Sequence, residues 1–345
     1  MLALPGFFGS ALDPLIGLAG ETRRRGVLML AGGLAFALSA ALSAAALGFW
    51  TLLVALLIGN PATGAFVSLA QATLMDRDAK QRERNMARWT VAGSVGYVAG
   101  PVLIAGGLAV GLGWRGVLAA LALAALPLAL AVRDVPQTTP STHDPLLRGF
   151  LTALRDREVL RWLALLEAAD LLLDVFHGFL ALYFVDVAGT GAVEAALAVA
   201  VWTGAGFVGD LALLAVLRRV SGRRYLRASA LAALAVYPAF LDVPSTGVKL
   251  ALLALLGLLN SGWYALPKAG LYSALPGRSG TAVAVAGLGG LVGAAVPAAL
   301  GFLAEHVGLA ATMWLLLLAP VVLLAGTPKR PAEPPRDRGR ERLAA

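Results

Sequence analysis

Four ionisable side chains interrupt a long apolar segment near the middle of the chain. Glu167, Asp170, Asp174 and His177 lie within residues 165–179, where almost every other residue is apolar. If this segment is a helix, the four side chains fall within an arc of about 80° and form a stripe about 15 Å long. A carboxylate near the centre of a bilayer costs about 2.5 to 3.5 kcal/mol, so in a membrane helix the stripe would face protein or a water-filled cavity.

The stripe is open to more than one chemistry. Asp170 and Asp174 could exchange a proton or recognise a cation, because burial disfavours a charged carboxylate and water or a cation restores it. Alternatively, they form a structural lock with an arginine or with Lys268. His177 could relay a proton or simply donate one hydrogen bond. We expect no metal site, because Asp170, Asp174 and His177 spread over about 10 Å of one helix and would need ligands from other helices.

The composition is that of a membrane protein. The 345 residues are 59% hydrophobic and only 14% charged, which leaves too little polar surface for a soluble domain. Apolar runs of about 18 or more residues recur from end to end, each long enough to cross a bilayer as a helix. The absence of cysteine excludes disulfides and thiolate chemistry. The net charge of +8 comes from basic residues clustered in short loops, which indicates orientation in a membrane rather than nucleic-acid binding.

We therefore predict an all-α polytopic membrane protein with eleven spanning helices. The expected spans are residues 2–20, 26–47, 51–75, 88–110, 115–132, 159–185, 193–217, 225–241, 248–274, 280–304 and 309–326. The longer, charged connections are residues 76–88, 133–161 and 218–227. A Pro- and Arg-rich tail over residues 327–345 is expected to be disordered and cytoplasmic.

The distribution of basic residues predicts the orientation of the chain. Most of them lie in loops on the same side as the tail, whereas the loops of the opposite side carry only Arg115 and Lys249. Because Lys and Arg are retained on the cytoplasmic side, we expect the C-terminus to be cytoplasmic in the cell inner (plasma) membrane.

An internal repeat divides the chain into two similar halves. Residues 6–9 (GFFG) match residues 206–209 (GFVG), and Asn60 matches Asn260 at the same offset. The repeat predicts an N-terminal bundle over 1–132, a linker over 133–158 and a C-terminal bundle over 159–326. The segment that opens the second copy has no partner in the first, so the chain is expected to lack the first of twelve helices. Either a start codon assigned too late or a real loss of the helix would produce this.

Parallel six-helix repeats joined by a long loop resemble the major facilitator superfamily of secondary transporters. The family has a loop of the form G-x-x-x-D-R/K-x-G-R/K-R/K, and residues 17–25 (GLAGETRRR) keep its glycine, an acid as Glu21, and a basic cluster that includes Arg23 and Arg24. Thr22 and Arg24 depart from the motif, where the family has a basic residue and a glycine. In the second copy, the basic residues that close the motif are matched by Arg219, Arg223 and Arg224. The resemblance implies that these residues clamp or gate the loops.

A second motif bears on the direction of transport. Residues 93–107 resemble the glycine-proline motif found in the fifth helix of the family's antiporters, with Gly96, Gly100 and Pro101 in place. The resemblance implies export. Alternatively, the small residues form a packing face for another helix. For Asp210, just after GFVG, we expect a gating or structural role.

The resemblance also implies a central cavity lined by the family's first, fourth, seventh and tenth helices. In this chain, the cavity-lining helices contain the stripe and six further residues that we assign to the substrate and proton pathway: Asn60, Gln71, Asn260, Trp263, Tyr264 and Lys268. The aromatic residues could contact an organic substrate or serve ordinary packing. Lys268 could extend to the interface, balance the charge of the stripe or bind an anionic substrate. Glu167 could instead pair with a loop arginine.

Together these features predict a secondary active transporter, monomeric and without cofactor, that couples proton movement to outward transport of a small organic solute. Two alternatives remain. A membrane-embedded enzyme would need a catalytic constellation, and no H-E-x-x-H, nucleophile elbow or P-loop occurs. The other is a non-transporting product of a shortened gene.

Overall fold

The computed structural model describes residues 3–132 and 145–328, and throughout these ranges the regular secondary structure is helical. The expected tail from residue 329 onward and the first part of the expected linker, residues 133–144, lie outside the described residues. The all-α class predicted from the sequence is confirmed.

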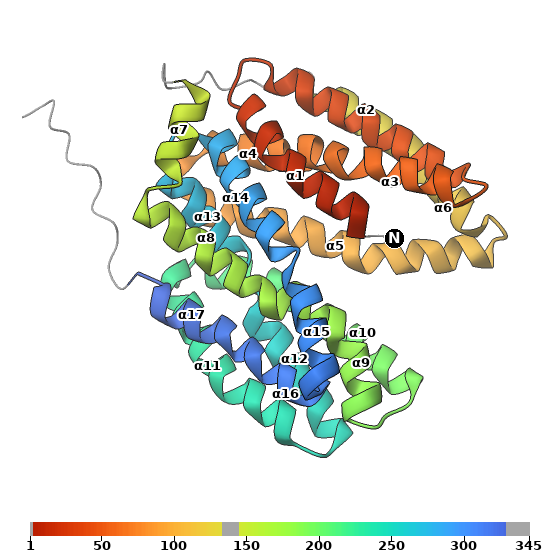
Figure 1. Ribbon diagram of the computed structural model, residues 1–345, viewed down its shortest axis with the longest axis vertical. Coiled ribbons are helices and arrows are strands. Elements are labelled where there is room, and N and C mark those ends of the chain that lie inside the picture. Colours follow the sequence, from red (N-terminus) through yellow and green to blue (C-terminus); the bar gives the residue numbers. More distant parts are fainter. Residues whose placement is uncertain (1–2, 133–144, 329–345) are drawn as a thin grey trace, which may run out of the picture.

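The N-terminal group of helices is the upper group in Figure 1. It consists of α1 (Ala3–Ala19), α2 (Arg25–Ala44), α3 (Phe49–Thr63), a π-helical turn (Gly64–Ser68), α4 (Leu69–Arg77), a 3-10 turn (Ala79–Gln81), α5 (Arg82–Ala109) and α6 (Gly113–Ala131). In this group α2 packs against both α3 and α6. The linker region contributes the short helix α7 (Leu146–Ala153), which lies beside α14 and α1.

The C-terminal group begins with one long, irregular segment. The segment comprises α8 (Arg157–Asp170), a π-helical turn (Leu171–Val175), α9 (Phe176–Leu182) and a second π-helical turn (Tyr183–Val187). The helices that follow are α10 (Ala192–Val216), α11 (Gly222–Asp242), α12 (Thr246–Asn260), α13 (Ala265–Ala274), α14 (Ser279–Gly293), α15 (Val296–Val307), α16 (Leu309–Met313), a 3-10 turn (Trp314–Leu317) and α17 (Leu318–Gly326).

Length and apolarity suit these helices to a bilayer. Within the described ranges, nine continuous helical segments have the length and composition to cross a membrane, and α1 is a shorter apolar helix. The eleventh long segment, α11, has 21 residues and carries three arginines near its start. The eleven segments correspond to the eleven expected spans.

The breaks inside the segments differ from the expected spans. The connection expected over residues 76–88 is mostly helical, and the break is confined to Asp78, whose carboxylate accepts a hydrogen bond from the N–H of Lys80 at 2.9 Å. The expected helix 248–274 is broken between α12 and α13, where Gly262 has a φ of 80°, a conformation that favours glycine. The expected helix 280–304 is broken between α14 and α15, just before Pro297.

An aromatic cluster consolidates the C-terminal group. Phe176 packs edge-on against Trp202, Tyr237 and Phe240, with ring centroids 5.1, 5.6 and 5.7 Å away. Lys249 extends into this cluster, only 4% exposed, and donates hydrogen bonds to the backbone carbonyls at the end of α11. The cluster therefore fixes α9 against α10, α11 and α12.

The two groups meet along α1 and α14, α4 and α14, and α5 with α10 and α13. One close approach lies at Gly17 of α1, where a Cβ would meet the backbone of Gly280 and Ala284 in α14. We call the end of the molecule that holds residues 20–25, 76–88, 218–224 and 275–279 the basic end. At the basic end the two groups are in contact.

Candidate functional site

The stripe of ionisable residues follows the irregular segment that runs from α8 to α9. Asp170 ends α8, Asp174 lies in the π-helical turn, and His177 lies in α9. A π-helical turn holds more residues per turn than an α-helix, so side chains on either side of it lose their common face. The stripe therefore divides between two cavities, and Asp174 alone of the four residues lines both.

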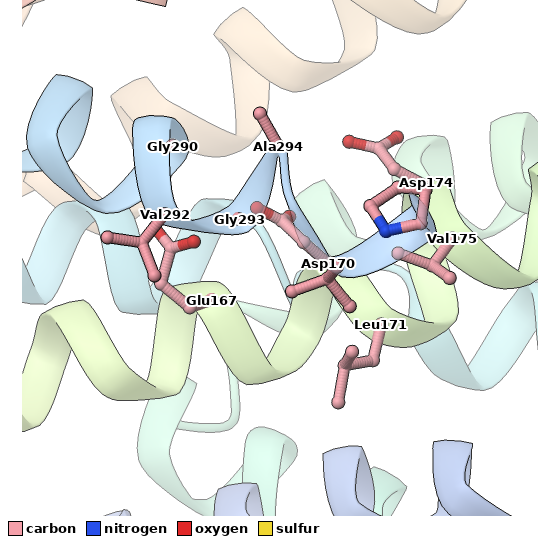
Figure 2. Close-up of a pocket in the computed structure, with 11 residues that line it drawn as sticks. Glu167, Asp170, Leu171, Asp174, Val175, Gly290, Val292, Gly293 and Ala294 are labelled. Atoms are coloured by element: carbon pink, nitrogen blue, oxygen red, sulfur yellow. The ribbon is translucent and has the colours of Figure 1, made fainter. Parts of the chain in front are cut away.

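The first cavity has a volume of about 350 Å³ and lies between α8 and the break that separates α14 from α15. Figure 2 shows Glu167 and Asp170 pointing from α8 toward this break. A Cβ at Gly289 or Gly293 would collide with the carboxylate of Glu167. The two glycines therefore make room for a carboxylate against the backbone of α14.

The second cavity, of about 160 Å³, lies between α5, α9 and α10. Its lining includes Asp174 and His177, Tyr97 of α5 and Asp210 of α10. The hydroxyl of Ser94 in α5 donates a hydrogen bond to the carboxylate of Asp210 in α10 at 2.5 Å. Asp210, 8% exposed, thus joins the two helix groups beside the cavity.

A third, smaller cavity of about 90 Å³ adjoins the break between α12 and α13. Asn260, the last residue of α12, lines it and is 2% exposed. Neither the amide nitrogen nor the amide oxygen of its side chain has a hydrogen-bond partner among the described residues. A buried polar group of this kind calls for water or a polar ligand, because leaving it unsatisfied costs about 1 to 3 kcal/mol.

Lys268 acts on the stripe at a distance. In the described part of the chain no carboxylate lies within 4.0 Å of its ammonium group, which lies 5.9 Å from the ring centre of Tyr264. Its charge nevertheless acts on the carboxylates of Asp13, Glu167 and Asp170. A direct lock between Lys268 and the stripe is therefore absent from this conformation.

Other residues predicted for the pathway lie apart from the cavities. Gln71 joins α4 to α13, donating to the hydroxyl of Tyr264 at 3.1 Å and accepting from that of Tyr272 at 3.2 Å. Asn60 donates to the carbonyl of Leu56 in its own helix at 3.0 Å. Trp263 is fully buried and donates to the hydroxyl of Ser229 at 2.9 Å, so its contacts are those of a packed core residue.

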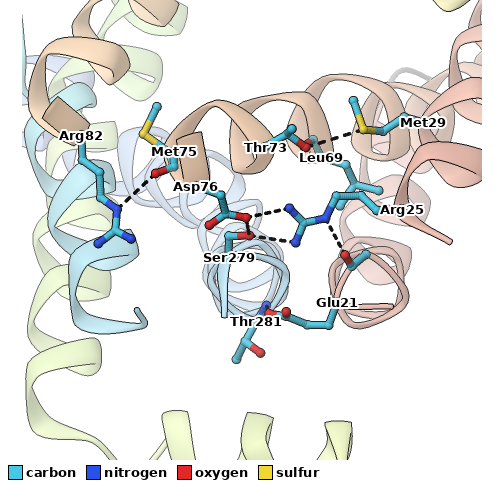
Figure 3. A network of polar contacts seen from close by, with 11 residues as sticks. Glu21, Arg25, Met29, Leu69, Thr73, Met75, Asp76, Arg82, Ser279 and Thr281 are labelled. Atoms are coloured by element: carbon cyan, nitrogen blue, oxygen red, sulfur yellow. Dashed lines mark hydrogen bonds and ion pairs between the residues drawn. The ribbon is translucent and has the colours of Figure 1, made fainter. Parts of the chain in front are cut away.

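A charged network joins the groups at the basic end, as Figure 3 shows. Arg25 donates to the carboxylate of Asp76 at 2.8 Å and to the hydroxyl of Ser279 at 2.8 Å. Ser279 in turn donates to Asp76 at 2.5 Å. Because Arg25 and Asp76 belong to the N-terminal group and Ser279 begins α14, the network crosses the interface.

Glu21 makes a second contact across this interface. Its carboxylate accepts a hydrogen bond from the backbone N–H of Thr281, in the first turn of α14, at 2.6 Å. The positive end of a helix dipole favours such an acid. Burial nevertheless raises the pKa of Glu21 above its ordinary value, although the hydrogen bond from Thr281 and the charge of Arg25 oppose the rise.

Sequence reasoning did not select Arg25 or Asp76. The signals available were three consecutive arginines, of which the third is buried, and an acid at the end of an apolar run. Of the basic residues that were predicted, Arg23, Arg24, Arg219 and Arg224 are exposed and Arg223 is half-buried.

The glycine-proline motif lies within the unbroken helix α5. A Cβ added at Gly96 or Gly100 would meet no atom of a neighbouring described residue within 4 Å. Pro101 is exposed. In this conformation Gly96 and Gly100 face no close neighbour among residues 3–132 and 145–328, whereas Ser94 of the same segment donates a hydrogen bond to Asp210 and Gly107 lies against Val117.

This architecture, with membrane-length helices in two groups and cavities at broken helices, is that of a membrane transporter. The profile of the Major Facilitator Superfamily matches residues 1–298, so the chain belongs to that superfamily and is a transporter, not an enzyme. The family predicted from the sequence is confirmed.

Solved structures share the fold. The fucose:proton symporter FucP of E. coli is similar with a TM-score of 0.80 and 17% identity, over 94% of this chain and 89% of that one. A structure of FucP in the outward conformation gives a TM-score of 0.77 at 18% identity, over 94% and 88% of the two chains. The human organic anion transporter MFSD10 gives 0.70 at 22% identity, over 93% and 82%. No curated protein matches the chain.

Proposed function

We propose that this transporter couples proton movement to the transport of a small organic solute by alternating access. The observation that carries the proposal is the position of Asp174, which lines two cavities from a π-helical turn. Such turns recur at functional sites in helices. The shared fold with a fucose:proton symporter supports proton coupling.

Under this proposal the basic end faces the cytoplasm, since arginine-rich loops are retained there. Contacts through Arg25, Ser279 and Glu21 close that end, so the conformation is outward-facing. Transport then requires these contacts to break while the groups close at the opposite end.

The carboxylates of the stripe are suited to carrying protons. No described cation lies within 4.0 Å of Asp170 or Asp174. The two acids line the same cavity, and two like charges in one cavity disfavour ionisation of both. A proton taken up while the cavity is open to one side of the membrane would be released when the cavity opens to the other side.

The lining of the cavities favours a neutral or cationic solute. Three acidic side chains line the first cavity with no basic one among its lining residues. Tyr97, Trp202 and Phe207 offer flat apolar faces in the second cavity. A multiply charged anion would meet repulsion there.

Asp174→Asn tests the coupling assignment. The purified protein would be reconstituted in vesicles and screened with sugars, amines and organic acids under an imposed pH gradient, with collapse of the gradient as a control. We expect Asp174→Asn to lose gradient-driven accumulation and to retain solute exchange, because the amide keeps the shape of the side chain but cannot carry the proton. Asp186→Asn, which changes an exposed acid outside the cavities, is the matched control. Gradient-driven accumulation that survives in Asp174→Asn refutes the assignment.

We further propose that the chain works as a monomer in the inner (plasma) membrane and that transport is outward. The direction follows from the motif around Gly96, Gly100 and Pro101 alone. The direction of transport can be tested by comparing right-side-out with inverted vesicles for any solute that the screen identifies.

A further inference from the structure

A fourth cavity, whose lining includes no residue of the stripe, opens at the basic end between α5 and α10. It has a volume of about 380 Å³ and is lined by Arg84, Arg88, Leu214 and Arg218. Arg84 and Arg88 are four residues apart on α5, and so are Leu214 and Arg218 along α10 and the turn after it. Residues with this spacing share a helix face, so two faces with three guanidinium groups meet across one cavity.

Among the described residues the three arginines have no acidic partner. Within residues 3–132 and 145–328 no carboxylate lies within 4.0 Å of any of them, and the one side-chain hydrogen bond among them joins Arg88 to Asn85 at 3.3 Å. Nearby Glu83 instead accepts a hydrogen bond from the backbone N–H of Gly222 at 3.2 Å. Three like charges around a shared space repel one another, and an anion in that space would remove the repulsion.

The position of the cavity identifies the kind of anion. Arg218 follows directly after the last apolar turn of α10, at the depth where a membrane helix reaches the lipid headgroups. Guanidinium groups match phosphate oxygens in pairs, and half-buried Leu214 adds an apolar wall. Basic pockets between membrane helices at this depth suit anionic headgroups.

We propose that this cavity binds an anionic phosphate group through Arg84, Arg88 and Arg218. Because α5 belongs to the N-terminal group and α10 to the C-terminal group, the bound phosphate bridges the interface. Its binding stabilises the conformation that is closed at the basic end. The phosphate comes either from an anionic phospholipid or from solution, and the same residues would hold it in both cases.

The test uses the whole protein in nanodiscs of phosphatidylcholine, with and without phosphatidylglycerol, and in phosphatidylcholine alone with inorganic phosphate. Lipid retention by native mass spectrometry and the midpoint of thermal unfolding are the readouts. We expect phosphatidylglycerol, inorganic phosphate or both to raise the midpoint. A response to only one of them identifies the source of the phosphate.

Variants separate a built site from general attraction between charges. Arg218→Gln should weaken binding roughly tenfold, and the triple change of Arg84, Arg88 and Arg218 to Gln should lose it, because each hydrogen bond to a charged group contributes about one factor of ten or more. The matched control changes Arg155, Arg157 and Arg161 to Gln, three exposed arginines outside the cavity. If the triple variant does not fold, the binding of Arg218→Gln is compared with that of the single control Arg161→Gln.

Two results would overturn the proposal. One is a wild-type protein whose midpoint responds to neither phosphatidylglycerol nor inorganic phosphate. The other is an equal loss of binding in the cavity variant and its control, since attraction would then depend on net charge alone.

Discussion

Ser279→Ala should open the basic end, because Ser279 is the one member of the charged network that belongs to the C-terminal group. Its hydroxyl accepts from Arg25 at 2.8 Å and donates to Asp76 at 2.5 Å, and its own side chain is 2% exposed. It is the first residue of α14, and the N-cap position belongs to Arg278, so alanine removes the contact and remains a good helix former. Arg25 and Asp76 keep their own ion pair after the change.

The size of the effect follows from these contacts. Hydrogen bonds to charged groups contribute about 1.5 to 3 kcal/mol, and here two are lost while water replaces part of them. A shift of about 1.5 to 3 kcal/mol changes the ratio of open to closed molecules roughly 10- to 150-fold. Ser273→Ala is the matched control, because this exposed serine donates only to the carbonyl of Ala269 in its own helix.

The chain lends itself to a direct distance measurement, because it contains no cysteine. Cysteines introduced at the exposed positions Gln81 and Ser221, one in each group at the basic end, would carry spin labels for double electron–electron resonance. We expect Ser279→Ala to enrich the longer distances and Ser273→Ala to leave the distribution unchanged. If Ser279→Ala gives the distribution of the control, the network does not hold this end closed.

Two further predictions concern buried polar groups. Burial raises the pKa of Glu21 above its ordinary value of 4.5 in the closed state, with Arg25 and Asp76 as the charged groups near it, and opening returns it to water. Protonated Glu21 therefore favours closure, and this contribution is present in full below pH 4.5 and is lost as the pH rises through the raised pKa. The same spin-label pair should report more closed molecules as the pH falls. In Glu21→Gln this pH dependence should be weaker. Asn260→Leu should raise the free energy of unfolding by about 1 to 2 kcal/mol, because it replaces an unsatisfied buried amide by an apolar group of similar size, while transport declines. A variant that is less stable and transports normally would show that Asn260 is satisfied by the fold.

Much of the architecture was predictable, because membrane spans depend on local composition. Eleven apolar runs predicted eleven long helical segments, and matches such as residues 6–9 with 206–209 predicted two related halves. The positions of the breaks were not predictable in the same way. Gly262 adopts its positive φ where α12 and α13 separate, and π-helical turns depend on the neighbours against which they pack.

The candidate site was predictable in its residue types but not in its partners. The stripe stood out because carboxylates are rare in apolar segments. By contrast, Arg25 and Ser279 are 254 positions apart in sequence, and no local pattern relates them. Trp263 has the residue type of a substrate contact, yet its surroundings make it a core residue. Such distinctions depend on which helices lie side by side.

The chemistry and the irregularities of the helices coincide in this molecule. Asp174 lies in a π-helical turn, Glu167 faces the break before α15, and Asn260 ends α12 at another break. A regular helix satisfies its own backbone and resists bending, whereas a break lets one part move relative to the next. Because the polar groups lie where the helices can bend, a change in their protonation or hydration alters the stability of the bend itself. Under the function proposed above, that relation would give proton uptake a direct mechanical route to the interface between the two helix groups, through α14, which carries the break at one end and Ser279 at the other.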